Sequence, residues 1–112
     1  MTERRRLRRF ETSFPATLRD PQNKPVLAAV VHSLSGGGLG CRLAHVLIPG
    51  ERFEVRINLM DQGSFMRLKA EVMWCRRPQM QTYRPLAIEA GLRFLQVDPA
   101  DARLYRLCFP GN

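Results

Sequence analysis

The first ten residues carry a cluster of arginines whose side chains suit the recognition of phosphates and purines. Arg4, Arg5, Arg6, Arg8 and Arg9 come directly before Phe10. A guanidinium is a planar fork that pairs bidentately with a phosphate or a guanine edge, and it also stacks on flat rings. Sixteen of the eighteen basic residues are arginines, a preference that charge alone does not require. A solvated basic arm, drawn to nucleic acid or acidic lipid by charge alone, is the competing interpretation.

A glycine-rich loop is the second feature with chemical potential. The segment Ser33-Leu34-Ser35-Gly36-Gly37-Gly38-Leu39 lies between two predicted strands. It offers two hydroxyls and exposed backbone N–H groups, and its glycines let a ligand approach the main chain closely. A flexible turn would explain the same residues. Either feature alone is weak, but their order and their distance along the chain are more specific.

Catalytic machinery is hard to assemble from this sequence. His32 and His45 lie in different segments, and neither is near a cysteine at metal-ligand spacing. No nucleophile-elbow, phosphate-loop or zinc-protease motif occurs. We therefore expect a binding module rather than an enzyme, with no catalytic residue, no metal and no cofactor.

Length and composition indicate one domain of a cytoplasmic protein. The chain has 112 residues, 45% of them hydrophobic, and a net charge of +8. No apolar run approaches the roughly 18 residues of a membrane span, and no apolar segment follows the basic N-terminus as in a secretory signal. The three scattered cysteines (Cys41, Cys75 and Cys108) fit reduced thiols.

Alternation of apolar and polar residues predicts half-buried antiparallel strands. The clearest runs are residues 52–59, 66–74 and 88–94, and shorter ones cover 14–18 and 39–43. The alternation assigns Trp74 to the core. The segment Val26–Val31 is apolar on both faces, as expected of a strand enclosed on both sides.

Turn and capping residues separate these runs. Turns are predicted at Asp20–Pro25, Gly36–Gly38, Pro49–Gly50 and Asp61–Ser64. Asp98 is a suitable N-cap with Pro99 behind it, which predicts a helix over 98–109. The sequence thus predicts an all-β protein, a small six-stranded antiparallel barrel with a C-terminal helix. A basic arm over 1–12 precedes the barrel at 13–112.

Taken together, these features resemble the PilZ domain family. That family has an Arg-x-x-x-Arg motif, then Asp/Asn-x-Ser-x-x-Gly, in a six-stranded split barrel with a C-terminal helix. Here Arg5 to Arg9 match the first motif, with Arg4 to Arg8 as an alternative frame, and Ser35 and Gly38 match the second. The segments Glu71–Trp74 and Gly91–Phe94 look like the late strands of the family.

The resemblance implies a bacterial receptor for cyclic di-GMP, a second messenger with two guanines and two phosphates. Arg5 and Arg9 would donate to guanine and phosphate, Ser35 would donate a hydroxyl hydrogen bond, and Gly38 would keep the loop open. Arg4 and Arg8 add donors that would hold a second, stacked ligand molecule. We expect binding to order the arm and to switch contacts with a downstream protein of motility, pilus or exopolysaccharide machinery.

Ser33 departs from the family pattern, since the family has Asp or Asn there. A carboxylate accepts from both N–H groups of the guanine edge, whereas one hydroxyl matches poorly, which costs about 1–3 kcal/mol. An adaptor that binds no nucleotide and acts through protein contacts is therefore the main alternative. A non-specific nucleic-acid binder is the third, disfavoured because no recognition helix carries the basic residues.

Overall fold

The computed structural model describes residues 9–22, 25–59, 64–77 and 87–97, which form six strands. Alternating apolar and β-branched residues favour this conformation, since every second side chain faces the same side of a strand. The strands are β1 (Arg9–Arg19), β2 (Val26–Ser35), β3 (Gly38–Leu43), β4 (Arg52–Leu59), β5 (Ser64–Arg76) and β6 (Ile88–Val97).

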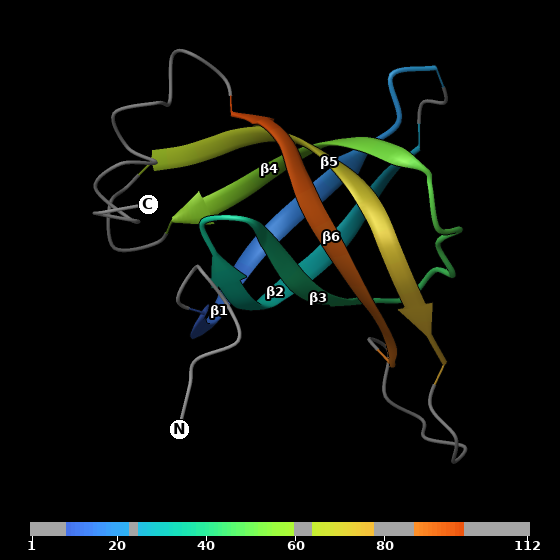
Figure 1. The fold of residues 1–112 in the computed structure, drawn as a ribbon, viewed down its shortest axis with the longest axis horizontal. Coiled ribbons are helices and arrows are strands. Elements are labelled where there is room, and N and C mark those ends of the chain that lie inside the picture. The colour runs from blue at the N-terminus through green and yellow to red at the C-terminus, as the bar shows by residue number, and fades with distance from the viewer. Residues whose placement is uncertain (1–8, 23–24, 60–63, 78–86, 98–112) are drawn as a thin grey trace.

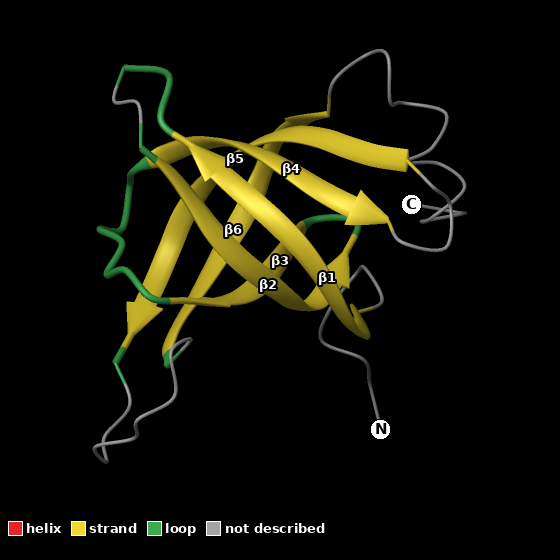
Figure 2. Ribbon diagram, turned by 180° about the vertical axis from the view of Figure 1, so that it is seen from behind, coloured by secondary structure: helices red, strands yellow, loops and turns green. Residues whose placement is uncertain are grey.

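The six strands close into one antiparallel barrel with the order β1-β2-β3-β6-β5-β4 (Figure 1). The ring is closed by β1 with β4, where Ala16 lies opposite Ile57, and by β3 with β6, where Gly38 lies opposite Arg93. This confirms the predicted all-β barrel. The described residues contain no helix (Figure 2), and the helix predicted over 98–109 lies outside them.

One face of every strand fills the barrel. The predicted inward residues of β3, Leu39, Cys41 and Leu43, are all buried, and Phe14 and Phe94 pack against the core from its margin. Large side chains that are fully enclosed include Leu18, Val31, Val55, Ile57, Met66 and Val72. Burial of this apolar surface, at roughly 25 cal/mol per Å², is the main force that holds the barrel together.

Two of the irregularities in strand pairing, one on β2 and one on β5, are β-bulges that change which residues face outward. On β2, Val31 lies opposite Cys41 and Ser33 opposite Gly40, so His32 is an extra residue. On β5, Val72 lies opposite Leu92 and Trp74 opposite Gly91, so Met73 is an extra residue. An extra residue reverses the alternation beyond it. The bulges therefore turn Ser33 and Trp74 to the outside of the barrel.

Two predictions about burial were wrong. Trp74 is 42% exposed rather than in the core, because the bulge at Met73 reverses the period-two pattern that had assigned it inward. The strand Val26–Val31 is not enclosed on both sides. Its outer face bears Val26, which is 54% exposed, and Ala28, which is also exposed, because nothing among the described residues covers that face.

The predicted turns at the described joints are present. Asp20 Oδ1 accepts a hydrogen bond from Gln22 N at 2.8 Å. At Pro49–Gly50, Glu51 N donates to Ile48 O at 3.0 Å, and Gly50 has a φ of 95°, a conformation that favours glycine. At the N-terminus, the predicted boundary between arm and barrel at residues 12–13 falls inside β1, which begins at Arg9.

Candidate functional site

The outer surface of the barrel has a glycine floor across two neighbouring strands. We use this name for Gly40 of β3 and Gly91 of β6, which lie opposite each other. Ser33 of β2 continues the row on one side, and Trp74 of β5 continues it on the other. Directly opposite residues in antiparallel strands share a face. Four strands thus bring a hydroxyl, two side-chain-free positions and an indole into one row.

Trp74 occupies the space that a side chain on Gly91 would need. A Cβ built at Gly91 would fall on the indole, 2.5 Å from Cε2 and 2.9 Å from Cδ1. The ring therefore rests on the backbone of β6 while its outer part is open to solvent. The guanidinium of Arg76 stands 5.4 Å from the ring centroid, within range of a cation–π contact. This is an aromatic surface held in a fixed place.

Ser33 lies at the opposite end of the row. Only 6% of it is exposed. A Cβ at Gly40 would lie 2.6 Å from Ser33 Oγ and 3.0 Å from Cε1 of His32. The Oγ atom is buried and has no hydrogen-bond partner in the part of the chain that the structure describes. A buried polar atom without a partner costs free energy, so this hydroxyl is a candidate for contact with a ligand.

The hydroxyl of Ser35 is engaged inside the glycine-rich loop. Its Oγ accepts hydrogen bonds from the N–H groups of Gly37 and Gly38, each at 3.2 Å, and donates to Gly38 O at 3.3 Å. One donor and two acceptor positions are the full capacity of a serine hydroxyl. Ser35 therefore fixes the shape of the loop, and the long bond to Gly38 O is the one most easily exchanged for a ligand.

Gly38 stands where the loop meets β6. It lies opposite Arg93, and a Cβ at Gly38 would collide with the carbonyl oxygen of Leu92. The N–H of Phe94 donates to Gly37 O at 2.9 Å, which ties the loop to β6. Glycine at position 38 thus allows close packing between the loop and the strand. That it also keeps the loop open for a ligand stays a prediction.

The arginine motif is described only at its last residue. Arg9 is the first residue of β1 and lies opposite Ser35 of β2 in the register of the pair. Residues directly opposite each other have Cα atoms about 4.5–5.5 Å apart. The two predicted motifs therefore meet at Arg9 and Ser35. Arg4, Arg5 and Arg8 lie outside the described residues.

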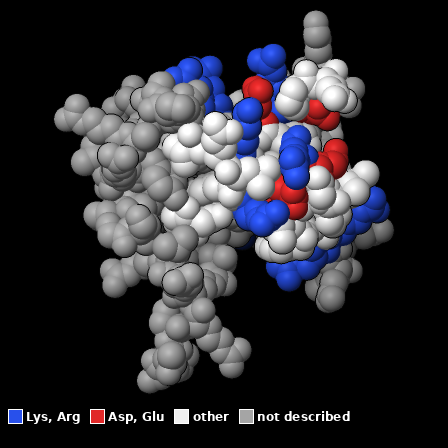
Figure 3. Space-filling model, turned by 45° about the horizontal axis from the view of Figure 1, so that its top comes forward, with Lys and Arg blue, Asp and Glu red and all other residues white. Residues whose placement is uncertain are grey.

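Two Arg–Glu–Arg triads border the glycine floor. On one side Glu71 pairs with Arg52 at 3.3 Å and Arg93 at 3.5 Å. On the other side Glu89 pairs with Arg76 at 2.9 Å and with Arg42 at 3.8 Å. Basic and acidic side chains are interspersed on the face in Figure 3. Each triad carries one net positive charge, so the floor attracts anions.

The glutamate of the second triad is held in its charged form. The hydrogen bond from Arg76 is the main cause that lowers the pKa of Glu89, and the charges of Arg76, Arg42 and His32 act in the same direction. Burial of part of the carboxyl opposes them. The triad therefore stays ionised at neutral pH and keeps Arg76 beside Trp74.

In the part of the chain that the structure describes, no three His, Cys, Asp or Glu side chains gather as they would around a metal ion. The same residues form no helix long and apolar enough to cross a membrane. A flat floor, an indole and surrounding arginines can instead hold a planar ring with an attached anion.

Sequence reasoning missed Trp74, Gly40 and Gly91 as members of this site. The period-two pattern pointed Trp74 inward, and only the strand register shows that two glycines lie between it and Ser33. The available signal was a pair of glycines inside predicted strands, which often marks a close approach of backbone to another group.

Solved structures with the same fold include cyclic di-GMP (c-di-GMP) complexes. The PilZ domain of YcgR from Escherichia coli with c-di-GMP aligns with a TM-score of 0.74 at 20% identity, over 96% of this chain and 89% of that chain. YcgR from Escherichia coli in complex with c-di-GMP aligns with a TM-score of 0.70 at 25% identity, over 95% of this chain and 44% of that chain. The motility inhibitor MotI of Bacillus subtilis aligns with a TM-score of 0.73 at 17% identity, over 96% of this chain and 50% of that chain.

The comparison with curated protein sequences found no match. The family model of the PilZ domain matches residues 3–109, nearly the whole chain. This match includes both motif segments, and the six-stranded barrel and the solved neighbours agree with it. The chain therefore belongs to the PilZ domain family, a family of c-di-GMP receptor domains.

Proposed function

We propose that this protein is a cytoplasmic, non-catalytic receptor that binds c-di-GMP over the glycine floor. The observation that carries the proposal is the register that sets Arg9 opposite Ser35 and Ser33 in one row with Gly40, Gly91 and Trp74. YcgR, with the same fold, was solved with c-di-GMP. The ligand consists of flat guanines and anionic phosphates, for which this surface has matching groups.

Each part of the ligand has a suitable contact. The exposed face of Trp74 accepts a stacked guanine, an interaction worth about 1–3 kcal/mol per base. Arg5 and Arg9 bind phosphate and guanine O6 and N7, which favour bidentate guanidinium contacts. Arg4 and Arg8 supply donors for a second, stacked ligand molecule. Gly38 leaves the loop backbone open to the ligand.

Ser33 tunes the affinity. Its buried Oγ has no hydrogen-bond partner among the described residues, so a guanine N–H that reaches it can donate without breaking a described bond. A single hydroxyl replaces the two acceptor oxygens of the acid usual in the family, and the lost contact lowers affinity by about five- to 150-fold. The phosphate and arginine contacts remain, so binding persists in a weaker form.

The proposed output is a change in protein contacts. When the ligand binds over the glycine floor, Arg4, Arg5 and Arg8 are drawn to it. A ligand shifts such an equilibrium only by its differential affinity for the two arrangements. The downstream partner is a protein of motility, pilus or exopolysaccharide machinery that distinguishes them.

A ligand-independent adaptor is the second candidate, and one observation favours it. Val46, Ile48 and Met73 are exposed apolar side chains. The segment with the first two is held along β5 by the bonds Leu47 N to Cys75 Sγ at 3.3 Å and Gly50 N to Val72 O at 2.8 Å. An adaptor would use such apolar side chains and would ignore nucleotides.

Isothermal calorimetry with c-di-GMP at physiological salt tests the proposal. The wild type is compared with Arg5→Ala/Arg9→Ala and with a matched control, Arg19→Ala/Arg56→Ala, which removes two exposed arginines of β1 and β4, away from the glycine floor. We expect saturable binding that the first variant loses and the control retains, with no binding of GMP or cyclic di-AMP. The stoichiometry distinguishes one ligand molecule from two. Absence of heat from a folded wild type would refute the receptor and leave the adaptor.

A further inference from the structure

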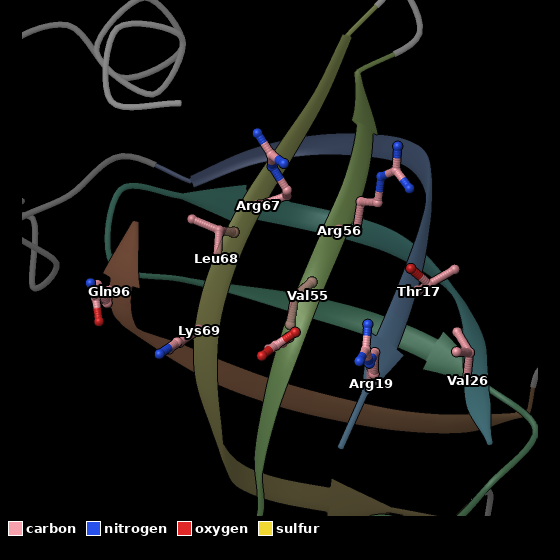
Figure 4. A pocket seen from close by; sticks show the side chains of 10 residues that line it. Thr17, Arg19, Val26, Val55, Arg56, Arg67, Leu68, Lys69 and Gln96 are labelled. Carbon is pink, nitrogen blue, oxygen red and sulfur yellow. The ribbon is translucent and has the colours of Figure 1, made fainter. Parts of the chain in front are cut away.

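A hollow with basic walls lies on the barrel away from the glycine floor. It crosses the outer face of β1, β4 and the first half of β5, and it measures about 680 Å³ (Figure 4). Arg19 and Thr17 come from β1, Arg56 from β4 and Arg67 from β5. The full lining is Thr17, Arg19, Val26, Glu54, Val55, Arg56, Arg67, Leu68, Lys69 and Gln96.

The strand register concentrates positive charge in this hollow. Arg56 lies directly opposite Arg67 on one side and Thr17 on the other. In the next row, Glu54 lies between Arg19 and Lys69. Four cations thus face one carboxylate. Like charges directly opposite each other in a sheet are destabilising, so an anionic group placed between them is favoured.

The basic residues of the hollow differ from those around the glycine floor. There, Arg42, Arg52, Arg76 and Arg93 each pair with a glutamate. In the hollow, Arg19, Arg56 and Lys69 form no ion pair with a carboxylate of the described residues. Arg56 instead stacks on Phe65, with Cζ 3.9 Å from the ring centroid. The charges of Arg19, Arg56 and Lys69 are therefore available to an outside partner.

We propose that this hollow docks an acidic segment of a partner protein. Carboxylates of the segment pair with Arg19, Arg56 and Lys69, with Arg67 adding to the positive field. An apolar side chain of the segment rests on Val26, which is exposed at the rim. Arginine and aromatic residues are the types enriched at protein interfaces. Since the barrel is closed, a partner strand cannot add to an edge, and side chains must carry the recognition.

A protein segment fits this surface better than single-stranded nucleic acid does. Single strands bind to barrel faces by stacking bases on exposed aromatic rings. Among the described residues lining or adjoining the hollow, the aromatic one is Phe65, and Arg56 already covers its ring. Carboxylates need no ring and pair directly with guanidinium forks.

The inference goes beyond the proposed function and does not depend on it. Eight of the ten residues that line the hollow come from β1, β4 and the first half of β5, and the other two are Val26 at the start of β2 and Gln96 near the end of β6. The row of Ser33 and Trp74 uses other parts of β2 and β6, together with β3 and the far end of β5. A protein that fails to bind c-di-GMP can still dock an acidic partner here.

Nuclear magnetic resonance titration of the full, ¹⁵N-labelled chain tests the docking site. The probe is a short synthetic peptide in which glutamate alternates with serine around one central leucine, and an oligouridine of equal charge is titrated in parallel. The test variant is Arg19→Gln/Lys69→Gln. The matched control, Arg42→Gln/Arg77→Gln, removes the same charge from other exposed positions.

We expect the peptide to shift the amide resonances of Arg19, Arg56 and Lys69, and the test variant to weaken its binding about three- to thirtyfold. The control should change it little. Equal weakening by both variants would mean attraction by net charge alone and would overturn the site. Tighter binding of the oligouridine to the same amides would overturn it in favour of a nucleic-acid surface. No shifts at these amides would also overturn it.

Discussion

The indole of Trp74 lies directly over Gly91, on the neighbouring strand of the barrel wall. The position opposite the ring must lack a side chain, since a Cβ there would overlap the indole. Glycine at 91 and tryptophan at 74 therefore act as one unit. The indole is 42% exposed yet fixed in place, which suits it to meet a flat ligand without a large loss of rotamer freedom.

Removal of this ring should weaken c-di-GMP binding. We expect Trp74→Ala to lower affinity about five- to 150-fold, the equivalent of one stacked base. Gly91→Ala should have a similar effect, because the new methyl group displaces the indole. Calorimetry measures both variants, and Phe65→Ala, which removes an equally exposed aromatic from β5, serves as the control. Unchanged affinity in Trp74→Ala would exclude stacking on this ring.

The two serines near the glycine-rich loop should differ in their contribution to stability. Ser35→Ala removes the acceptor of two N–H groups and should cost about 1–2 kcal/mol of unfolding free energy. Ser33→Ala removes a buried hydroxyl that has no partner among the described residues, so it should be neutral or stabilising. Urea denaturation measures the unfolding free energy of the wild type and of the two variants, each of which loses a single hydroxyl group. A larger loss in Ser33→Ala than in Ser35→Ala would contradict the assigned hydrogen bonds.

The acid usual in the family should restore affinity at position 33. We expect Ser33→Asp to bind c-di-GMP about five- to 150-fold more tightly, because a carboxylate accepts both N–H groups of the guanine edge. The same charge, placed at a buried position, should lower stability without ligand. Calorimetry and thermal denaturation report the two effects. Ser33→Asn adds a side chain of similar size without the charge. It therefore separates the effect of the buried charge from the effect of the larger side chain.

The unfolding free energy at acidic pH should depend on Glu89. Its pKa is lowered in the folded protein, chiefly by the hydrogen bond from Arg76, so its ionised form stabilises the fold. This contribution is complete at pH values above the ordinary glutamate pKa of 4.5 and disappears as pH falls through the lower, folded value. Denaturation at neutral and acidic pH should therefore show a difference between wild type and Glu89→Gln that shrinks on acidification. Glu54→Gln is a control outside the triads.

Cys41 should be inert in the folded protein. Burial is the main cause that raises the pKa of its thiol to about 12, and nearby Cys75 acts in the same direction. The thiolate is the reactive form, so iodoacetamide should label Cys41 only as fast as the barrel opens. Mass spectrometry of a Cys75→Ser/Cys108→Ser variant follows this site alone. Rapid labelling under native conditions would contradict the enclosed position of the thiol.

Much of the barrel could be predicted from local patterns, because alternation and turn residues are properties of short segments. The inward residues of β3 and β4 followed this pattern, and Phe53 and Val55 are buried as expected. The bulges could not be predicted in this way. One extra residue at His32 or Met73 leaves no clear mark in composition, yet it decides on which side of the wall Ser33 and Trp74 lie.

The candidate site was predictable in part for the same reason. The glycine-rich loop and its hydroxyls are contiguous in the sequence, so Ser33, Ser35 and Gly38 could be singled out. The partnership of Trp74 with Gly91, and of Ser33 with Gly40, is made by strand pairing between distant segments. The prediction that Val26 is enclosed was wrong for a related reason. The pattern of apolar residues in a strand does not show whether another element covers its outer face.

The order of the strands around the barrel has a consequence for how the protein is made. β3 can pair with its second neighbour only after β6 has been synthesised, because Gly38 pairs with Arg93. Pairings between distant residues form slowly because chain entropy is lost before contacts compensate for it. Until residues 88–93 leave the ribosome, the outer edge of β3 has unpaired N–H and C=O groups that invite pairing with other chains. A barrel that has no free edge when complete thus has one at β3 while residues 44–87 are synthesised.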